Sequence, residues 1–324
     1  MEKQNIAVIG VGYLGKFHAE KYAKIPEVSL VGVVDSDYKR AQEIASQLGT
    51  KAYADYRELL GKVHAVSIVV PTPLHYAIAR DFLCHNTDIL LEKPMTTTLE
   101  EADELIHLAN DKACIIQVGH LERFNPAVVA LQNIITEPMF IESHRIGVYK
   151  ERGTDVSVVL DLMIHDIDII LNFVCSDIKT IHAAGIPVIS DHVDIANARL
   201  EFVNGCVANV TASRISVKNE RKIRLFQKDA YISVNFANQE IMVISKDPQG
   251  NSLPIPGMRM QQLSFGKEDV LEDEIKAFVE SVKTRRSPLV TGIVGRAALN
   301  IALSVMDQIK QSSKQFGIDM KDDR

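Results

Sequence analysis

The sequence has few cysteines, and no two of them stand close together. Its four cysteines include no C-x-x-C pair, so neither a disulfide framework nor a zinc-type spacing is indicated. Widely spaced thiols are typical of a reduced, cytoplasmic protein, and that location is the prediction. We expect all four to be small buried hydrophobic side chains, namely Cys84, Cys114, Cys175 and Cys206.

Long apolar runs and an excess of basic charge are also missing. No apolar run approaches the length needed to span a membrane, and the N-terminus has no basic segment followed by an apolar one. The formal net charge is −6, which does not favour nucleic acid or an anionic membrane surface as a partner. We find no internal repeat and no low-complexity segment.

The length and the order of apolar runs predict two domains. The chain has 324 residues, of which 46% are hydrophobic and 24% charged, as in ordinary globular proteins. Apolar strands alternate with helices up to about Gly119, which predicts a doubly wound parallel sheet over residues 1–120. Strands are then grouped, which predicts an α+β domain with a mostly antiparallel open sheet over residues 121–324, whose last helices could pack back on the first domain.

The expected elements follow from periodicity and from turn residues. In the first domain, after an initial strand, they are helix Lys16–Ile25, strand Val28–Val34, helix Tyr38–Leu48, a short helix capped by Asp55 and Glu58, strand Ala65–Val70, a helix from His75 to about His85, strand Ile89–Leu91, a helix from Thr98 to Ala109 and strand Ile115–Val118. In the second they are strand Phe140–Tyr149, helix Val156–Val174, strands Val193–Val203, Cys206–Ile215, Arg221–Gln227, Ala230–Phe236 and Ile241–Ser245, an irregular loop from Pro248 to Gly257, and helices Val270–Thr284 and Ile293–Lys314 before a polar tail.

Three glycines follow the first apolar run at the spacing G-x-G-x-x-G. Gly10 permits a tight turn, and Gly12 lets a pyrophosphate approach the backbone because no Cβ is in the way. Gly15 lets the next helix pack closely on its strand, while that helix presents free N–H groups to phosphates. Strand, glycine turn, helix, strand and terminal acid together form the dinucleotide-binding fingerprint, which is far more specific than the glycines alone.

The acid at the end of the second strand bears on the choice of dinucleotide. Asp35 lies 35 − 15 = 20 residues after the last glycine, where a carboxylate can accept hydrogen bonds from a ribose 2′-hydroxyl. The same charge would repel the 2′-phosphate of NADP. Lys39 and Arg40 on the next helix turn leave NADP possible, but the pattern favours NAD.

One apolar helix carries polar residues on a single stripe. Asp161, His165, Asp168 and Asn172 follow the spacing i, i+4, i+7, i+11, which places them on one helix face. Buried carboxylates are costly unless they are paired or hydrogen-bonded. The stripe could be an internal network that fixes packing, a half-site for a metal, or a catalytic acid–base pair. For Asp161 and His165 the fingerprint favours the acid–base pair, whereas Asp168 and Asn172 fit the network equally well.

Lys93 is the remaining candidate for chemistry. It follows the strand Ile89–Leu91 and stands between Glu92 and Pro94, at the edge where such sheets bind ligands. Most lysines are solvated surface groups, but a lysine here could hydrogen-bond the oxygen that reacts. The bond from Lys93 to Pro94 is a candidate for a cis peptide.

These motifs together resemble the Gfo/Idh/MocA family of oxidoreductases. The resemblance rests on the glycine loop, the turn from Pro71 to His75, the Glu92-Lys93-Pro94 turn, and the Asp161-x-x-x-His165 pair. It implies a Rossmann domain, a second domain whose open sheet mediates a homo-oligomer (dimer or tetramer), a nicotinamide dinucleotide, and oxidation or reduction of a sugar or cyclitol hydroxyl. It also implies that Lys93, Asp161 and His165 are catalytic, with His165 as the general base.

A narrower resemblance is to the branch that contains UDP-N-acetylglucosamine 3-dehydrogenases, which supply amino-sugar precursors of lipid A. It rests on the segment from Arg123 to Pro126 and on Glu151 to Asp168. A nucleotide sugar would need cationic donors, and Arg123, Arg145, Lys150 and Arg152 are the candidates, although each could equally be a solvated surface residue. The candidate cofactor-binding residues are Gly10, Gly12, Tyr13, Leu14, Gly15, Asp35, Thr72, His75, Glu92 and Lys93; the candidate substrate-binding residues are Arg123, Asn125, Arg145, Tyr149, Arg152 and Asp168; no metal ligand is assigned.

Two alternative functions stay open on these residues. One is a dehydrogenase of a free sugar or an inositol, which differs from the first in not requiring the UDP group. The other is a catalytically silent protein that senses dinucleotides, as some relatives in the family do. Retention of Lys93, Asp161 and His165 argues against a silent sensor, since such a protein has no chemical need for them.

Overall fold

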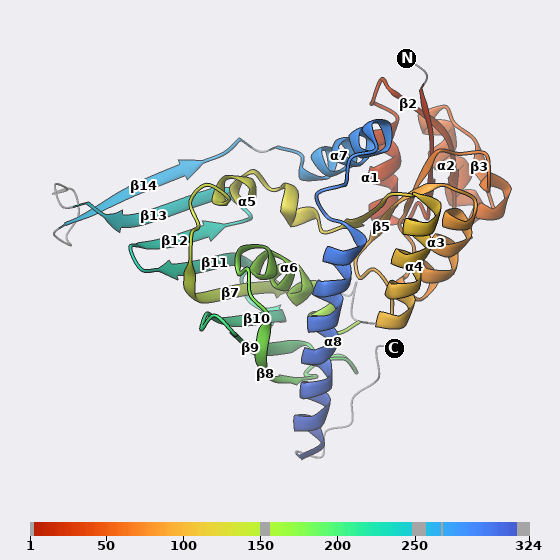
Figure 1. The fold of residues 1–324 in the computed structure, drawn as a ribbon. Helices are drawn as coiled ribbons and strands as arrows, with labels where there is room; N and C mark the ends of the chain where they lie inside the picture. Colours follow the sequence, from red (N-terminus) through yellow and green to blue (C-terminus); the bar gives the residue numbers. More distant parts are fainter. Residues whose placement is uncertain (1–2, 150–155, 248–256, 267, 316–324) are drawn as a thin grey trace. The chain divides into compact units, whose positions relative to one another are not determined.

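The computed structural model describes residues 3–149, 156–247, 257–266 and 268–315, and the chain forms two compact units (Figure 1). The first unit comprises the chain up to Leu121 together with Asp269–Leu299. The second comprises Glu122–Glu268 and, of the described residues, 300–315. The last long helix, α8 (Gly292–Gln315), therefore contributes residues to both units.

The first unit is built on a six-stranded sheet in which every described pair of neighbours is parallel. Its strand order is β3-β2-β1-β4-β5-β6, which confirms the predicted doubly wound Rossmann sheet. The strands are β1 (Gln4–Ile9), β2 (Val28–Val34), β3 (Ala52–Tyr53), β4 (Ala65–Ile68), β5 (Asp88–Glu92) and β6 (Ile116–Gly119). Because the strands are parallel, the loops that follow β1, β2, β4 and β5 share one edge of the sheet.

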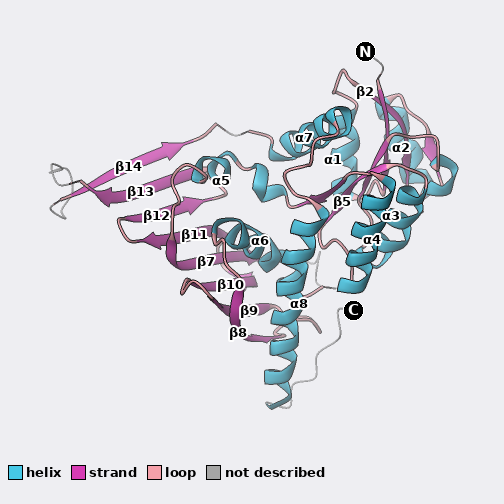
Figure 2. Ribbon diagram, viewed as in Figure 1, coloured by secondary structure: helices cyan, strands magenta, loops and turns pink. Residues whose placement is uncertain are grey.

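Five helices and two short 3₁₀ turns belong wholly to this unit in the described residues, and all five helices were expected at about these positions. They are α1 (Tyr13–Tyr22), η1 (Tyr56–Leu59), η2 (Thr72–Leu74), α2 (Tyr38–Leu48), α3 (His75–Cys84), α4 (Leu99–Lys112) and α7 (Val270–Thr284). Figure 2 shows α7 beside α1. Both contribute to one hydrophobic core, where Phe278 and Ile275 of α7 pack with Tyr22 of α1 and Leu90 of β5.

Local signals explain where these helices begin and end. The Thr98 side chain accepts a hydrogen bond from the Glu101 N–H and the Glu101 carboxylate accepts from the Thr98 N–H, which is the capping box that starts α4. Gly49 ends α2 in the left-handed conformation, with φ of 66°. Helix α1 begins at Tyr13, directly after its N-cap Gly12 and three residues before the expected Lys16.

The second unit contains an eight-stranded sheet in the order β14-β13-β12-β11-β7-β10-β9-β8. Within the described strands only β7 and β10 pair in parallel, so the predicted mostly antiparallel sheet is confirmed. The strands are β7 (Pro138–Val148), β8 (Ile178–Ile186), β9 (Ile195–Phe202), β10 (Val207–Ser216), β11 (Glu220–Gln227), β12 (Ala230–Asn235), β13 (Glu240–Lys246) and β14 (Met258–Ser264). Strand β8 was not expected, and neither was β14, which directly follows the loop signals ending at Gly257.

The two faces of this sheet differ in burial. Ile141, Leu225 and Ile232 are register partners on three neighbouring strands and are fully or almost fully buried. Helix α6 (Ile164–Phe173) packs against β7 and β10, and α5 (Pro126–Leu131) lies near it in Figure 2. Alternation places Phe140 and Phe226 on the opposite face, where both are only half-buried.

The predicted helix Val156–Val174 differs from the structure in its first part. Residues Val159–Met163 form a π-helical turn, and only Ile164–Phe173 form a regular α-helix. A π turn contains more residues than an α turn, so it changes the direction in which Asp161 points relative to the rest of the stripe.

The cysteine prediction was partly wrong. All four cysteines are free thiols, but Cys84 and Cys175 are exposed and Cys114 is half-buried; only Cys206 is buried. Cys84 is the last residue of α3 and Cys175 follows α6, so both lie where a helix ends rather than on its inner face. In the described part of the chain, no helix is both long and apolar enough to cross a membrane.

Candidate active site

Two of the three glycines after β1 stand at positions that a residue with a side chain could not occupy. Gly10 has a φ of +85°, and a Cβ on Gly15 would lie 1.9 Å from the Gly10 carbonyl oxygen. At Gly12, in contrast, a Cβ would meet nothing within 4 Å. Gly12 is the N-cap of α1, and no side chain caps that helix. The helix thus presents uncapped N–H groups beside open space, which fits a bound pyrophosphate.

Asp35 stands at the end of β2 and is almost fully buried. Its Oδ2 accepts a hydrogen bond of 3.0 Å from the Val11 N–H, so the carboxylate also braces the glycine loop. Its Oδ1 accepts from the Asp37 N–H at 2.9 Å, and the Arg40 guanidinium lies 3.4 Å away. Arg40 lies 3.4 Å from Oδ2 as well, so within the protein these contacts already use about as many acceptor positions as a carboxylate has.

Two further strand-end loops are joined by a buried histidine. His75, the first residue of α3, has its Nδ1 2.9 Å from the Pro94 carbonyl oxygen and its Nε2 2.9 Å from the Val70 carbonyl oxygen. Burial lowers the pKa of His75 despite these two contacts. His75 therefore ties the loop after β4 to the turn after β5. Thr72 opens the 3₁₀ turn η2 in the same loop, and direct contacts of Thr72 or His75 with a cofactor stay a prediction.

Lys93 is half-buried in the turn that follows β5, and the bond from Lys93 to Pro94 is cis. The Glu92 carboxylate accepts a hydrogen bond of 3.3 Å from the Lys93 backbone N–H. Burial alone would raise the pKa of Glu92, but His18, Lys93 and His75 lower it. Glu92 is therefore an anion whose position fixes the start of this turn. Lys93 belongs to the first unit, while Asp161 and His165 belong to the second.

Asp161 and His165 are half-buried polar residues in an otherwise largely buried segment, and Asn172 near its end is half-buried too. Asp161 lies in the π turn, and its backbone N–H donates to the Ser157 carbonyl oxygen at 3.0 Å. His165 is the second residue of α6. π turns are frequent at functional sites, and half-exposure of both side chains leaves them accessible for acid–base chemistry.

The other acids of this helix have arginine partners. Asp168 accepts two hydrogen bonds from Arg123, from Nε at 2.6 Å and from a terminal nitrogen at 3.0 Å. Asp166 accepts two from Arg145, both at 3.0 Å, and Arg145 also donates to Glu122 at 3.0 Å. Burial alone would lower the pKa of Arg145, but Asp166 and Glu122 raise it, so the guanidinium stays charged.

These pairs bear on three predicted substrate-binding residues. All three are at most 6% exposed: Arg123 and Asp168 form one bidentate pair, and Arg145 forms another with Asp166. For Asp168, the structure thus shows the internal network that was one of the alternatives for the polar stripe. Asn125 is also buried; it caps α5 through the Ala127 N–H and donates to the Phe236 carbonyl. Tyr149 is exposed, and Arg152, like Lys150, lies outside the described residues.

A cavity of about 310 Å³ in the second unit includes Asp161 in its lining. Three arginines line it too. Arg145 is held by its buried pair, and Arg214 contacts Asp194 and the Val156 carbonyl. Arg221 is exposed on β11, opposite Arg145 in the strand register, and no ion pair to it is found within the described residues. The full lining of this cavity consists of Arg145, Ile146, Gly147, Val148, Asp161, Leu162, Arg214, Asn219, Glu220, Arg221 and Ala237.

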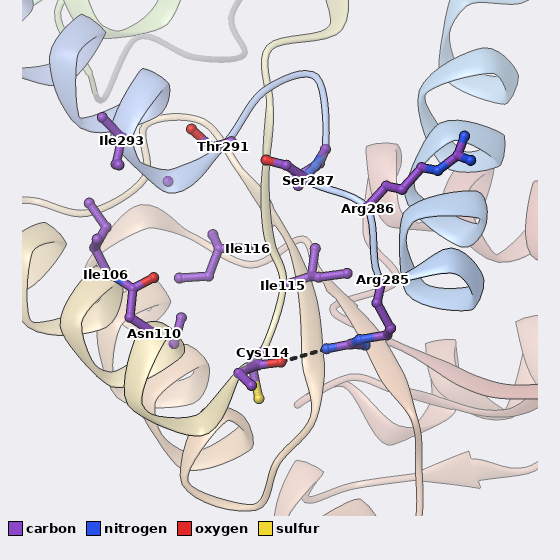
Figure 3. A pocket seen from close by; sticks show the side chains of 14 residues that line it. Ile106, Asn110, Cys114, Ile115, Ile116, Arg285, Arg286, Ser287, Thr291 and Ile293 are labelled. Atoms are coloured by element: carbon purple, nitrogen blue, oxygen red, sulfur yellow. Dashed lines mark hydrogen bonds between the residues drawn. The ribbon is translucent and has the colours of Figure 1, made fainter.

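A second cavity, of about 600 Å³, lies in the first unit but contains none of the predicted site residues (Figure 3). Isoleucines from α4 and β6 line it together with Arg285, which donates hydrogen bonds to the Ala113 carbonyl and to Asp88. It lies at the start of β6, whereas ligands of such sheets bind at the carboxyl ends of strands. In the residues that the structure describes, no cluster of three or more His, Cys, Asp or Glu side chains could hold a metal ion.

Comparison with known proteins agrees with this geometry. Residues 4–120 match the family described as an oxidoreductase family with an NAD-binding Rossmann fold, and residues 140–233 match the GFO/IDH/MocA C-terminal domain. The chain belongs to the Gfo/Idh/MocA family of oxidoreductases. It is an NAD-binding oxidoreductase, and the glycine loop, Asp35 and the uncapped start of α1 fit that cofactor.

Individual relatives cover almost the whole chain. UDP-N-acetylglucosamine 3-dehydrogenase from Acidithiobacillus ferrooxidans is 38% identical over 92% of this chain and 95% of that protein. A solved structure of that enzyme has a TM-score of 0.91 and covers 96% of this chain and 99% of its own. The scyllo-inositol 2-dehydrogenase (NAD(+)) of Bacillus subtilis is 26% identical over 96% of this chain and 95% of that protein. A levoglucosan dehydrogenase solved with NADH and levoglucosan shares the fold, with a TM-score of 0.85, 19% identity, and coverage of 96% of this chain and 98% of its own.

Sequence patterns missed several residues that shape the site. His18, Glu122, Asp166, Arg221 and Glu274 were not singled out. His18 lies three residues after Gly15, and this spacing on the first helix was the available signal. Arg221 could be recognised only once the register of β11 against β7 was known.

The glycine loop yields a matched pair of substitutions. Gly15→Ala is expected to lower the stability of the protein by about 3 kcal/mol, because the new methyl group meets the Gly10 carbonyl. Gly12→Ala is expected to fold nearly as well as the wild type but to bind NAD much more weakly, because its methyl group enters the space left for the pyrophosphate. Thermal unfolding and calorimetric titration with NAD measure the two effects. Wild-type NAD affinity in Gly12→Ala would contradict the assignment.

The buried pair at Asp168 can be tested by stability. Asp168→Asn is expected to lower the free energy of unfolding by about 3 kcal/mol, because Arg123 keeps its buried charge without a matching anion. Asp177→Asn, an exposed position after the same helix, is the control and should change it by less than about 0.5 kcal/mol. Denaturant unfolding at neutral pH gives both values. Equal stability of the two variants would show that the pair does not hold the helix.

Proposed function

We propose that this protein is an NAD-dependent dehydrogenase that oxidises the 3-hydroxyl of UDP-N-acetylglucosamine to a ketone, in the supply of amino-sugar precursors of lipid A. The observation that carries the proposal is the half-exposed Asp161 and His165 on one helical segment, with Asp161 in the lining of a cavity that also contains arginines. The similarity to UDP-N-acetylglucosamine 3-dehydrogenase supports this substrate over others.

The proposed chemistry divides between protein and cofactor. Oxidation of a secondary alcohol removes a hydride from carbon and a proton from the hydroxyl, and NAD supplies the hydride acceptor. His165 is the general base for the hydroxyl proton, since the ordinary pKa of histidine, about 6.5, suits proton transfer near neutrality. Asp161 orients the imidazole and stabilises its charged form. Lys93, on the first unit, stabilises the negative charge that develops on the oxygen, which is worth about 3 kcal/mol in a preorganised site.

Recognition of the diphosphate is assigned to Arg221. A pyrophosphate needs cationic donors, and bidentate arginine contacts suit it. Arg145 and Arg214 in the same cavity already contact carboxylates, while Arg221 is exposed and has no ion pair within the described residues. Arg221 therefore replaces Arg123 and Arg145 as the donor we propose for the nucleotide part of the substrate.

The substrate proposal is tested by following the absorbance of reduced nicotinamide. UDP-N-acetylglucosamine is expected to reduce NAD, whereas N-acetylglucosamine and inositols should give little or no rate. Lys93→Ala and His165→Ala should each lower kcat by about 10²-fold or more with NAD affinity nearly unchanged. Turnover of free sugars or inositols without the UDP group would favour the alternative dehydrogenase. A lack of turnover with every sugar, with NAD bound, would favour the silent sensor.

Arg221 has a matched control on its own strand. Arg221→Ala should raise the KM for UDP-N-acetylglucosamine about tenfold with little change in kcat, because it removes a charged contact to a group that does not react. Arg224→Ala lies on the opposite face of β11, where Arg224 pairs with Glu142, and should leave both constants unchanged. The same KM in both variants would remove Arg221 from the binding site.

We also propose that the protein forms a homo-oligomer through the open face of the second unit's sheet. Phe140, Phe226 and Tyr231 pack together there, with ring centroids 5.8 Å and 5.1 Å apart. These aromatic side chains are only half-buried, so a second copy could cover them. Phe226→Asp is expected to lower the molar mass measured in solution by light scattering, while wild type gives a dimer or tetramer. A monomeric wild type would overturn the proposal.

A further inference from the structure

One face of the first unit's sheet carries a buried polar layer. Ser67, Leu90 and Gln117 are register partners on β4, β5 and β6, so their side chains lie on the same face. Glu92 and Gly119 follow two residues after Leu90 and Gln117 and share that face. Helices α1 and α7 cover it, since Leu90 belongs to the core that they build. Polar side chains in such a core need partners or neutrality.

Contacts connect α1 to the turn that carries Lys93. Tyr22 and Ser67 share a hydrogen bond of 2.8 Å between their hydroxyl oxygens, and His18 Nδ1 lies 3.3 Å from the same Ser67 oxygen. The other ring nitrogen of His18 lies 3.3 Å from Glu92 Oε1. The Glu92 carboxylate lies over Gly119, where a Cβ would come within 2.9 Å of it. The chain of contacts thus ends at the residue before Lys93.

Glu274 enters this layer from α7 and is fully buried. Its backbone carbonyl accepts a hydrogen bond of 3.1 Å from the Gln117 side chain. Neither of its carboxyl oxygens has a hydrogen-bond partner within the described residues. Burial of an ionised carboxylate without partners is very costly, and such a group takes up a proton instead.

The charged and titratable groups around Glu274 also favour its neutral form. The facing groups are Tyr22 and His18 from α1 and Glu92 from β5, whereas Ser67 and Gln117 are neutral. Burial, followed by the negative charge of Glu92, raises the pKa of Glu274 well above its ordinary value. Glu92 has cationic and histidine neighbours that lower its pKa, and Glu274 does not.

We propose that Glu274 is a neutral carboxylic acid, so that Glu92 is the ionised member of the two. Because the Glu92 carboxylate accepts a hydrogen bond from the Lys93 N–H, Glu274 thereby acts as a positioning residue for the turn that carries Lys93. Glu274 does not touch the reacting atoms; it acts through Glu92. The importance for catalysis rests on the proposed function, whereas the protonation of Glu274 does not.

The proposal fixes the sign of a pH effect. The folded protein keeps a proton on Glu274 that the unfolded chain releases above the ordinary glutamate pKa of 4.5. The stability that this proton contributes is fully present below that pKa and is lost as the pH rises towards the raised pKa of the folded state. The unfolding equilibrium constant therefore rises tenfold per pH unit through this window on account of Glu274.

The test compares Glu274→Gln and Glu274→Met with the wild type and with Glu280→Gln, an exposed position on the same helix. Denaturant unfolding of each full-length protein is measured from pH 5 to pH 8. Both Glu274 variants are expected to lose the tenfold-per-unit dependence, while Glu280→Gln follows the wild type. Glu274→Met covers the case in which the amide of Glu274→Gln lacks partners. Parallel curves for all four proteins would overturn the proposal.

Infrared spectra give a second reading that does not depend on activity. At pH 8 exposed carboxyl groups are ionised, so the wild type should retain the carbonyl band of a protonated acid. The band should vanish in both Glu274 variants and persist in Glu280→Gln and in Glu92→Gln. A band that vanishes in Glu92→Gln and persists in Glu274→Gln would place the proton on Glu92 and overturn the proposal. Failure of the substrate experiments would leave this result unaffected.

Discussion

Two buried arginine–aspartate pairs hold helix α6, and the candidate catalytic residues depend on them. Asp166 and Asp168 are two residues apart and so point to nearly opposite sides of the helix. Arg145 on β7 holds one side and Arg123 in the 3₁₀ turn Leu121–Phe124 holds the other. A helix held from two sides cannot rotate about its axis. His165, next to Asp166, is thereby kept half-exposed while apolar neighbours fill the core.

The first unit uses one carboxylate for two purposes. Asp35 accepts a hydrogen bond from the Val11 N–H inside the glycine loop and stands where the fingerprint places the ribose contact. A residue that braces the loop from within has little freedom to move when a ligand arrives. The binding surface for the cofactor is therefore formed by folding, and little ordering is left for the moment of binding.

Local signals in the sequence were enough to predict much of the fold. Strand Val28–Val34 and helices Tyr38–Leu48 and Val270–Thr284 have the predicted bounds, because valine runs, aspartate caps and a terminal glycine act over a few residues. Strand β14 was missed because its residues are mostly exposed and polar, so no apolar alternation marks it. The ion pairs of α6 could not be predicted, since Arg123 and Asp168 are 45 residues apart and meet only in the folded unit. The candidate chemistry was thus readable from motifs, while the contacts that orient it were not.

The π turn that contains Asp161 has a consequence for how this segment can vary. Each residue of a helix turns the chain by about 100°, so deletion of Leu162, between Asp161 and His165, would rotate Asp161 by that angle relative to His165. The arginine pairs lie after this point and would stay in phase. The extra residue of the π turn therefore sets the direction of the Asp161 side chain, independently of helix α6, which the arginine pairs hold in place.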